Sequence, residues 1–205
     1  MKARKASVER NTKETKIKLS LNIDGSGKTK INTGIGILDH MLELFAFHGL
    51  FDLEVKASGD LKVDIHHTNE DIGIVLGDAF KKALADKEGI KRFGSASVPM
   101  EDVVASVVVD ISGRGFFNGI DRVKGGLPHI EAKNKENYSI DYANHFFESL
   151  AKRLGMNLSI KLASTNEDLH TNLEPIFKAL GVALDQATQI DTRRKGVPST
   201  KGVID

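Results

Sequence analysis

HHTNE at residues 66–70 and HTNLE at residues 170–174 are two versions of one histidine–carboxylate pattern. A lone histidine precedes each of them, His40 by 26 positions and His145 by 25. Five of the seven histidines therefore fall into two equivalent frames. A self-similarity of this kind predicts two similar units of sheet and helix that face each other.

The sequence around the histidines matches in the same frame. The dipeptide Leu-Gly at 76–77 falls on the same dipeptide at 180–181, and Glu43 falls on Glu148. Chance is the alternative, because any chain that mixes strands and helices shows some self-similarity. The coincidence of histidines, carboxylates and Leu-Gly pairs favours duplication.

Apolar periodicity indicates the order of the secondary-structure elements. Residues 15–23 alternate between apolar and polar side chains, which is typical of a strand with one buried face. Apolar stripes at helical spacing mark the helices. The expected strands are 15–23, 28–31 (a hairpin partner of the first), 53–57, 61–65, 103–111, 116–120 and 158–162, and the expected helices are 34–47, 70–85, 138–154 and 173–187. The Gly- and Pro-containing segment 124–137 is expected to be a mobile surface loop.

Composition narrows the class of protein. At 205 residues the chain forms one large domain or two small ones, and an apolar fraction of 40% supports a real core. With 29 basic and 28 acidic residues, the chain has no electrostatic attraction to nucleic acid or to an anionic membrane. No apolar run reaches the length of a membrane span, and the basic residues 1–10 lack the apolar segment of a signal peptide. We therefore expect a soluble, cytoplasmic protein that binds neither nucleic acid nor membrane.

The residue types also limit the metal chemistry. The chain contains no cysteine, so a metal ion would need nitrogen and oxygen ligands. Imidazole and carboxylate groups bind zinc, manganese or iron. On a helix His66 and Glu70 share one face and can hold the same ion, whereas His67 points about 100° away and serves a second ion or a substrate. His170 and Glu174 repeat the first of these arrangements.

Longer stretches resemble one protein family. IGILDHML (residues 35–42) and DIHHTNEDIG (residues 64–73) resemble the two N-terminal signatures of imidazoleglycerol-phosphate dehydratase. Further similar stretches are RNTKET at 10–15, RFG at 92–94, VPM at 98–100, VDISGR at 109–114, EPIFKAL at 174–180 and PSTKGVI at 198–204. These motifs are specific, and together they span nearly the whole chain.

The resemblance implies an α+β fold made by internal duplication of a four-stranded β-sheet plus helices unit (ribosomal protein S5 domain 2-like), with the two halves packed through their helices. Residues 1–90 would form the first half, residues 91–190 the second, and residues 191–205 a phosphate-binding tail, although composition alone favours a free tail. The resemblance further implies trimers that assemble into a 24-subunit particle, with two Mn2+ ions per subunit bound where subunits meet.

The implied reaction is the loss of water from imidazole glycerol phosphate to give imidazole acetol phosphate in histidine biosynthesis. The proton to be removed is barely acidic, and the implied solution is to bind the ring as imidazolate between two metal ions. The implied metal ligands are His40, His66, His67, Glu70, His145, His170 and Glu174, and the implied catalytic set is Glu14 as general base with His40, His67, Glu70 and Glu174. The phosphate would bind Arg92, Arg114, Lys178, Ser199 and Lys201, for which solvated surface positions are the alternative.

One ligand position departs from the family pattern. The family's second motif has two adjacent histidines, and here Thr171 occupies the second position. A hydroxyl is a poor substitute for imidazole at a transition metal, although a water can fill the vacancy. We therefore expect one ion to bind normally and the other weakly. Pro175 is costly beyond the first turn of a helix, so the helix in the altered segment 164–175 is expected to begin near Asn172.

Three functions remain open from the sequence. The leading one is an active dehydratase. The second is an assembled but catalytically impaired homologue or variant with one weakened metal site. The third is a generic metal-dependent hydrolase, in which Glu14, the arginines and the Ser-Lys pair would have no reason to occur together. The ligand types alone do not distinguish manganese from zinc or iron.

Overall fold

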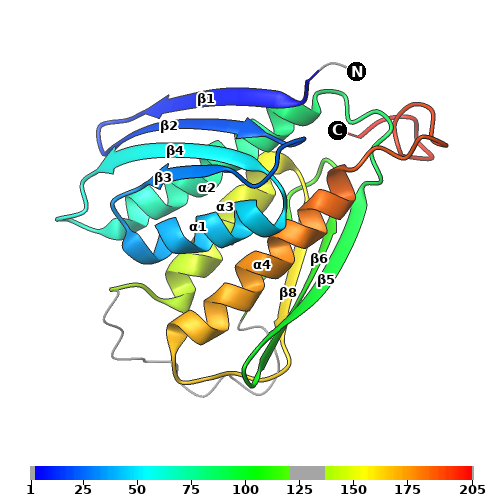
Figure 1. Cartoon of the computed structure of the whole chain (residues 1–205). Helices are drawn as coiled ribbons and strands as arrows, with labels where there is room; N and C mark the ends of the chain where they lie inside the picture. Colours follow the sequence, from blue (N-terminus) through cyan, green and yellow to red (C-terminus); the bar gives the residue numbers. More distant parts are fainter. Residues whose placement is uncertain (1–2, 121–136, 205) are drawn as a thin grey trace.

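The computed structural model describes residues 3–120 and 137–204, which form two four-stranded sheets with helices between them (Figure 1). The first sheet has the order β1 (Lys5–Asn11), β2 (Thr15–Asn22), β4 (Asp52–Gly59), β3 (Thr29–Asn32), and the second has the order β5 (Phe93–Met100), β6 (Val103–Asp110), β8 (Asn157–Leu162), β7 (Phe116–Asn118). In each sheet the first three strands are antiparallel and the last is parallel to its neighbour. The matching order confirms the predicted duplicated α+β fold. The expected loop at 124–137 lies outside the described residues, apart from Asn137.

The helices form the two inner layers of this arrangement (Figure 1). They are α1 (Gly36–His48), α2 (Ile65–Leu84), α3 (Ile140–Leu154) and α4 (Leu169–Thr188). Helix α2 packs on β1 and β2, and α4 packs on β5 and β6. Across the middle, α1 packs on α4 and α2 packs on α3, so the halves contact each other through their helices. Within the described part of the chain, none of these helices has the length and apolar character needed to cross a membrane.

Strand β2 shows why each sheet has one buried face. Ile17, Leu19 and Leu21 are almost fully buried beneath the helices, whereas Lys16 and Lys18 are exposed. Burial of each aliphatic side chain contributes about 1.5–3 kcal/mol. The alternation that predicted the strand is therefore an alternation between core and solvent.

One predicted strand pairing and one predicted strand are wrong, although the strand expected at 28–31 is present as β3. Residues 28–31 do not form a hairpin with β2, because β3 pairs in parallel with β4. Residues 61–65 contain a turn instead of a strand: the Val63 N–H donates to the Asp60 carbonyl at 2.7 Å, and the Val63 side chain is exposed. The apolar side chains of this segment are therefore not buried together on one side, as they would be in a strand.

Periodicity misses β1 and β5, each of which is one of the two edge strands of its sheet. In β1 only Ala6 is fully buried, and in β5 only Gly94. An edge strand pairs with one neighbour and is held largely by backbone hydrogen bonds, so its sequence carries a weak hydrophobic pattern.

Helices α2 and α4 begin earlier than periodicity predicts, because an aspartate caps each of them. The Asp64 carboxylate accepts the His66 N–H at 2.9 Å, and the Asp168 carboxylate accepts the His170 N–H at 3.2 Å. A cap of this kind satisfies a backbone donor that the first helical turn leaves free. Both caps place the histidines in the first turn of their helices.

The prediction that α4 begins near Asn172 is also wrong, since Pro175 lies inside a continuous helix that begins at Leu169. Proline removes a backbone hydrogen bond and costs about 3 kcal/mol in a helix interior. The Asn172 side chain offsets part of this cost by donating to the carbonyls of Asn166 and Asp168 at 2.6 and 2.7 Å. These bonds fix the turn that carries His170.

Two equivalent glycines allow the halves to approach closely. A Cβ on Gly77 in α2 would lie 2.8 Å from the carbonyl oxygen of Leu150 in α3, and a Cβ on Gly181 in α4 would lie 2.3 Å from that of Phe45 in α1. Both distances are shorter than a van der Waals contact, so the backbones can meet only where the side chain is absent. The repeated Leu-Gly dipeptide therefore marks the two points where helices of opposite halves cross.

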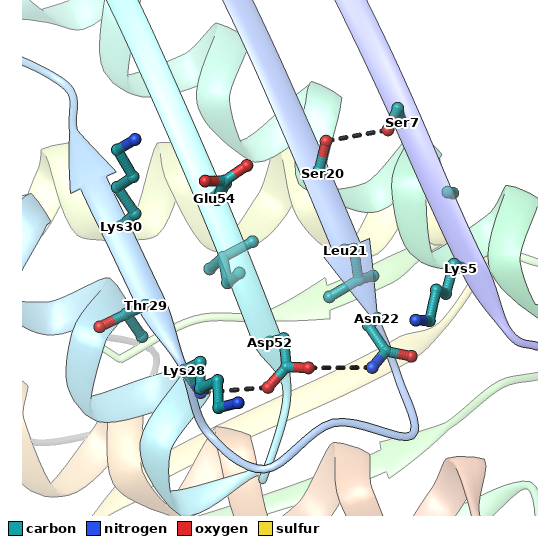
Figure 2. Close-up of a pocket in the computed structure, with 12 residues that line it drawn as sticks. Lys5, Ser7, Ser20, Leu21, Asn22, Lys28, Thr29, Lys30, Asp52 and Glu54 are labelled. Carbon is teal, nitrogen blue, oxygen red and sulfur yellow. Dashed lines mark hydrogen bonds between the residues drawn. The ribbon is translucent and has the colours of Figure 1, made fainter.

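The outer face of the first sheet carries a polar hollow of about 530 Å³ (Figure 2). At its edge the Asp52 carboxylate accepts the Ser26 N–H at 2.8 Å, the Asn22 side-chain amide at 3.0 Å and the Lys28 N–H at 3.2 Å. These hydrogen bonds, that from Ser26 first, lower the pKa of Asp52 to about 2. The ionised carboxylate thus fixes the connection between β2 and β3.

Gly181→Ala is expected to destabilise the protein by about 1–3 kcal/mol, because the added methyl group overlaps the Phe45 carbonyl. Alanine otherwise favours a helix by about 1 kcal/mol relative to glycine. Gly36→Ala is the matched control, since no atom lies within 4 Å of a Cβ built at this first residue of α1. Urea unfolding midpoints should fall for Gly181→Ala and stay or rise for Gly36→Ala. Equal midpoints for Gly181→Ala and wild type would contradict the close contact.

Candidate active site

Helices α1 and α4 bring His40, His170 and Glu174 together. His170 Nε2 lies 2.7 Å from Glu174 Oε2, and His40 Nε2 approaches the same oxygen at 3.6 Å. The two imidazole rings are stacked, with centroids 5.1 Å apart. Within the described ranges, this is the one trio of potential ligands whose donor atoms all lie within 4.8 Å of one another. Two imidazole nitrogens and a carboxylate at such distances suit a divalent cation.

The equivalent residues form a second, looser cluster between α2 and α3. His66 Nε2 lies 3.2 Å from Glu70 Oε2, one helical turn away. His145 of α3 places its ring 4.5 Å from that of His66, centroid to centroid. A cavity of about 360 Å³ opens beside these residues and is also lined by Ile74 and Glu148. The cluster therefore has space for a small ligand at its side.

Each cluster combines the two halves of the chain. His40 of the first half joins the His-Glu pair of the second, and His145 of the second half joins the His-Glu pair of the first. The exchange follows from the packing of α1 on α4 and of α2 on α3. Spacing along the sequence does not reveal it, because spacing says nothing of which helices meet.

His67 belongs to neither cluster, although it is adjacent to His66. Its Nδ1 lies 3.1 Å from Asp60 Oδ2, and this hydrogen bond raises the pKa of His67 despite the opposing effect of burial. The negative charge of Glu14 contributes to the same shift, and the Glu14 carbonyl accepts the Asp60 N–H at 3.1 Å. The structure thus brings the predicted base together with His67. The sequence motifs do not identify Asp60 as part of the group formed with Glu14 and His67. The one feature of the sequence that points to it is its position in the turn before the histidine pair.

Comparison with known proteins identifies the family. The sequence profile described as imidazoleglycerol-phosphate dehydratase matches residues 33–184. An imidazoleglycerol-phosphate dehydratase of Pelobacter propionicus is 52% identical over 202 residues, which cover 98% of this chain and 99% of the relative. This chain belongs to the imidazoleglycerol-phosphate dehydratase family. It is therefore a hydro-lyase of histidine biosynthesis, as the motifs predict.

Two solved structures of the family share the fold of this dehydratase. The Staphylococcus aureus enzyme has a TM-score of 0.77 at 32% identity and covers 91% of this chain and 99% of its own. The Pyrococcus furiosus enzyme, solved in complex with (S)-C348, has a TM-score of 0.78 at 38% identity and covers 96% and 99%. The two-sheet architecture is thus that of the family. The family is generally metal-dependent, and the His40 cluster is a possible metal site.

The two carboxylates of the dehydratase have different surroundings. Lys178 Nζ lies 2.6 Å from Glu174 Oε1, whereas Ile74 holds the equivalent position one turn after Glu70. Burial raises the pKa of Glu174, but hydrogen bonds from Lys178 and His170 together outweigh it and shift the pKa downward. Glu174 is therefore an ionised group paired with Lys178, whereas the described part of the chain shows no ion pair between Glu70 and a lysine or arginine.

Thr171 does not extend the first cluster. Its side chain is buried, and its Oγ1 donates to Asp168 Oδ2 at 3.1 Å, which reinforces the cap of α4. His67, at the equivalent position of α2, is 34% exposed. The departure therefore replaces a partly exposed imidazole with a buried hydroxyl that already has a partner.

The residues predicted to bind phosphate make different contacts. Arg92 donates to both oxygens of Asp110 at 2.6 and 3.0 Å and to the Pro198 carbonyl at 3.0 Å. This bond ties the segment after α4 to the second sheet and brings Ser199 near Arg92, so the segment does not extend freely into solvent. The Ser199 hydroxyl accepts the Lys201 N–H at 3.2 Å.

The other two cations of the predicted phosphate site have other partners. Lys178 lies with the His40 cluster, through its ion pair with Glu174. Arg114 lies in the turn after β6, where its N–H donates to the Ser112 hydroxyl at 3.3 Å. The polar hollow of Figure 2 shares no residue with either cluster or with these cations.

The exchange of histidines between halves predicts how metal binding responds to substitution. In a Mn2+ titration, His66→Ala and His145→Ala are each expected to remove one tightly bound ion, and the double variant should remove no more than that one. His145→Ala combined with His170→Ala should remove ions from both clusters. Equilibrium dialysis with metal analysis measures the number bound. A further loss in the His66/His145 double variant would contradict a shared site.

Proposed function

We propose that this dehydratase converts imidazole glycerol phosphate to imidazole acetol phosphate and that it uses two Mn2+ ions per chain. The observation that carries the proposal is the pair of equivalent histidine–glutamate clusters in a chain of this family. Both clusters lie on helices packed at the centre of the fold, where a rigid scaffold can hold the ligand atoms at fixed positions.

The donor atoms fit a divalent metal. His40, His170 and Glu174 would hold one ion, and His66, Glu70 and His145 would hold a second. His67, which lies outside both clusters of its own chain, would be a ligand at a contact between subunits. Once bound, the ions would supply Lewis-acid stabilisation of the substrate's imidazole ring and a template for its orientation. Three protein donors per cluster leave coordination positions for the substrate.

Glu14 would act as the general base, with a carboxylate oxygen accepting the proton from the C–H group next to the departing hydroxyl. The exposed Glu14 side chain stands on a well-fixed turn. Thr12 Oγ1 accepts the N–H groups of Glu14 and Thr15 at 3.1 and 2.9 Å, and Thr15 Oγ1 donates to the buried Asp71 at 2.5 Å. A base on such a turn can approach the substrate with little loss of conformational freedom.

The phosphate would be bound by Arg92, Arg114, Ser199 and Lys201. Lys178 would lie between the phosphate and the metal. The bond of Arg92 to the Pro198 carbonyl supports this role for the segment after α4, because it already holds Ser199 close to a guanidinium. Arginine and lysine donate charge-assisted hydrogen bonds to phosphate, so a substrate anchored there would be oriented along its length.

Thr171 favours an unequal pair of metal sites. Its hydroxyl is committed to Asp168 and buried, so it offers no ligand in place of imidazole. The second candidate function is therefore an assembled but catalytically impaired member of the family with one weakened metal site. A generic metal-dependent hydrolase has no support once the family is known.

We also propose that the chains form trimers that assemble into a 24-subunit particle in the cytoplasm. The partial exposure of His67, outside both clusters of its own chain, supports a role at a contact between subunits. Neither nucleic acid nor a membrane is expected as a partner.

Titration of the metal-free dehydratase with Mn2+ tests the choice between the two candidates. Full turnover of imidazole glycerol phosphate at low Mn2+ is expected if the enzyme tolerates Thr171, and Thr171→His should then change turnover little. In the impaired homologue Thr171→His should raise turnover sharply. Absence of turnover by folded protein and by Thr171→His at saturating Mn2+ would refute the proposed reaction.

Glu14→Gln is expected to lower kcat by about 10²–10⁴-fold, because glutamine cannot accept the proton. KM and the number of bound Mn2+ ions should stay close to the wild-type values. Glu9→Gln is the control, since Glu9 is an exposed carboxylate on β1 that pairs with Lys18 at 2.8 Å. Wild-type kcat in Glu14→Gln would exclude Glu14 as the base.

A further inference from the structure

Asp60 makes the one side-chain hydrogen bond that the described part of the chain gives to His67. Nδ1 of His67 lies 3.1 Å from Oδ2 and 3.3 Å from Oδ1 of Asp60. The side chains are 34% and 27% exposed, so both remain within reach of a ligand. The contact lies outside the two metal clusters and beside Glu14.

The direction of this hydrogen bond fixes the form of the imidazole. An ionised carboxylate only accepts hydrogen bonds, so Nδ1 of His67 must carry the proton. In a neutral imidazole the other nitrogen, Nε2, then carries the lone pair. Asp60 therefore selects the tautomer in which Nε2 is the ligand atom, as carboxylates do for histidines at many metal sites.

Asp60 is itself held on both sides by its backbone. Its N–H donates to the Glu14 carbonyl at 3.1 Å, and its carbonyl accepts the Val63 N–H at 2.7 Å. One residue thus connects the turn that carries the base to the imidazole. Substitution of its side chain leaves both backbone bonds in place, which separates the role of the carboxylate from the role of the turn.

The other half of the chain shows the same frame without this group. The register of β6 with β8, continued by three residues, puts Thr165 in the place of Asp60. Thr171 stands in the place of His67, and Asp102 in the place of Glu14. The Asp102 carboxylate accepts the Asn166 side-chain amide at 2.9 Å. The duplicated scaffold therefore forms without a carboxylate–imidazole pair at this position, so the fold does not require one.

We propose that Asp60 is a positioning residue that holds His67 with Nε2 free to bind a divalent metal ion and keeps it at a fixed separation from Glu14. The inference rests on the proposed metal-dependent function and deepens it. Asp60 touches neither substrate nor metal in this role, because its carboxylate acts through the imidazole.

Asp60→Asn in the full-length protein tests the proposal. The side-chain amide of the introduced asparagine can donate a hydrogen bond to Nδ1 of His67 and thereby favour the tautomer with a proton on Nε2. A protonated Nε2 has no lone pair with which to bind a metal ion. Loss of such an outer partner lowers metal affinity or activity by about 10–100-fold. We expect the Mn2+ affinity of one of the two sites to fall by this factor, as measured by electron paramagnetic resonance of free Mn2+. The value of kcat should fall in parallel, and KM should change little.

Asp78→Asn is the matched control. Asp78 lies on α2, its side chain is 28% exposed, and it pairs with Arg153 at 2.8 Å. The variant therefore removes a carboxylate about as exposed as that of Asp60, but one that has no histidine partner in the described part of the chain. It should retain wild-type Mn2+ affinity and kcat. Asp60→Ser removes the carboxylate without introducing an amide and should reproduce the loss if Asp60→Asn folds poorly.

Wild-type Mn2+ affinity in folded Asp60→Asn and Asp60→Ser would overturn the proposal and show that the pair is only a surface contact. Failure of the proposed function gives a different result, in which wild-type protein binds Mn2+ but does not convert imidazole glycerol phosphate. The affinity comparison between Asp60 and Asp78 variants does not depend on turnover, so the two failures are distinguishable.

Discussion

Close packing between the helices of the two halves is the constraint on which the rest of the structure depends. Gly77 and Gly181 leave no side chain where α2 meets α3 and where α4 meets α1, so the backbones come into direct contact. This approach brings His40 of one half within 3.6 Å of Glu174 of the other. A wider separation would keep the sheets and helices but would separate the lone histidines from their carboxylates.

Duplication supplies the same scaffold twice, and the side chains then give each copy its own chemistry. Lys178 stands beside Glu174, whereas Ile74 stands beside Glu70, so the two carboxylates experience different local charge. The backbone frame is set by burial, strand pairing and helix caps, which tolerate these changes. The buried Thr171 side chain can therefore differ from its counterpart, His67, without altering the fold.

Most of the fold could be predicted from the sequence where one face of an element is buried. β2 and α1 are examples, since their apolar periodicity follows directly from contact with the core. The predictions fail where hydrogen bonds dominate instead. Edge strand β1 is held by backbone pairing, and α4 continues through Pro175 because Asn172 and Asp168 fix its first turn. Such bonds join residues whose spacing carries no periodic signal.

The sequence by itself determined the duplication, the family and the set of histidines and carboxylates, because these depend only on residue types and on intervals along the chain. The tertiary structure alone decided which of them meet. It placed His40 with Glu174 and His145 with His66, excluded His67 from both clusters, and brought Asp60 between His67 and Glu14. The reason is physical: side chains from different elements come together through helix crossing and strand register, and neither is encoded in the distance between two residues along the sequence.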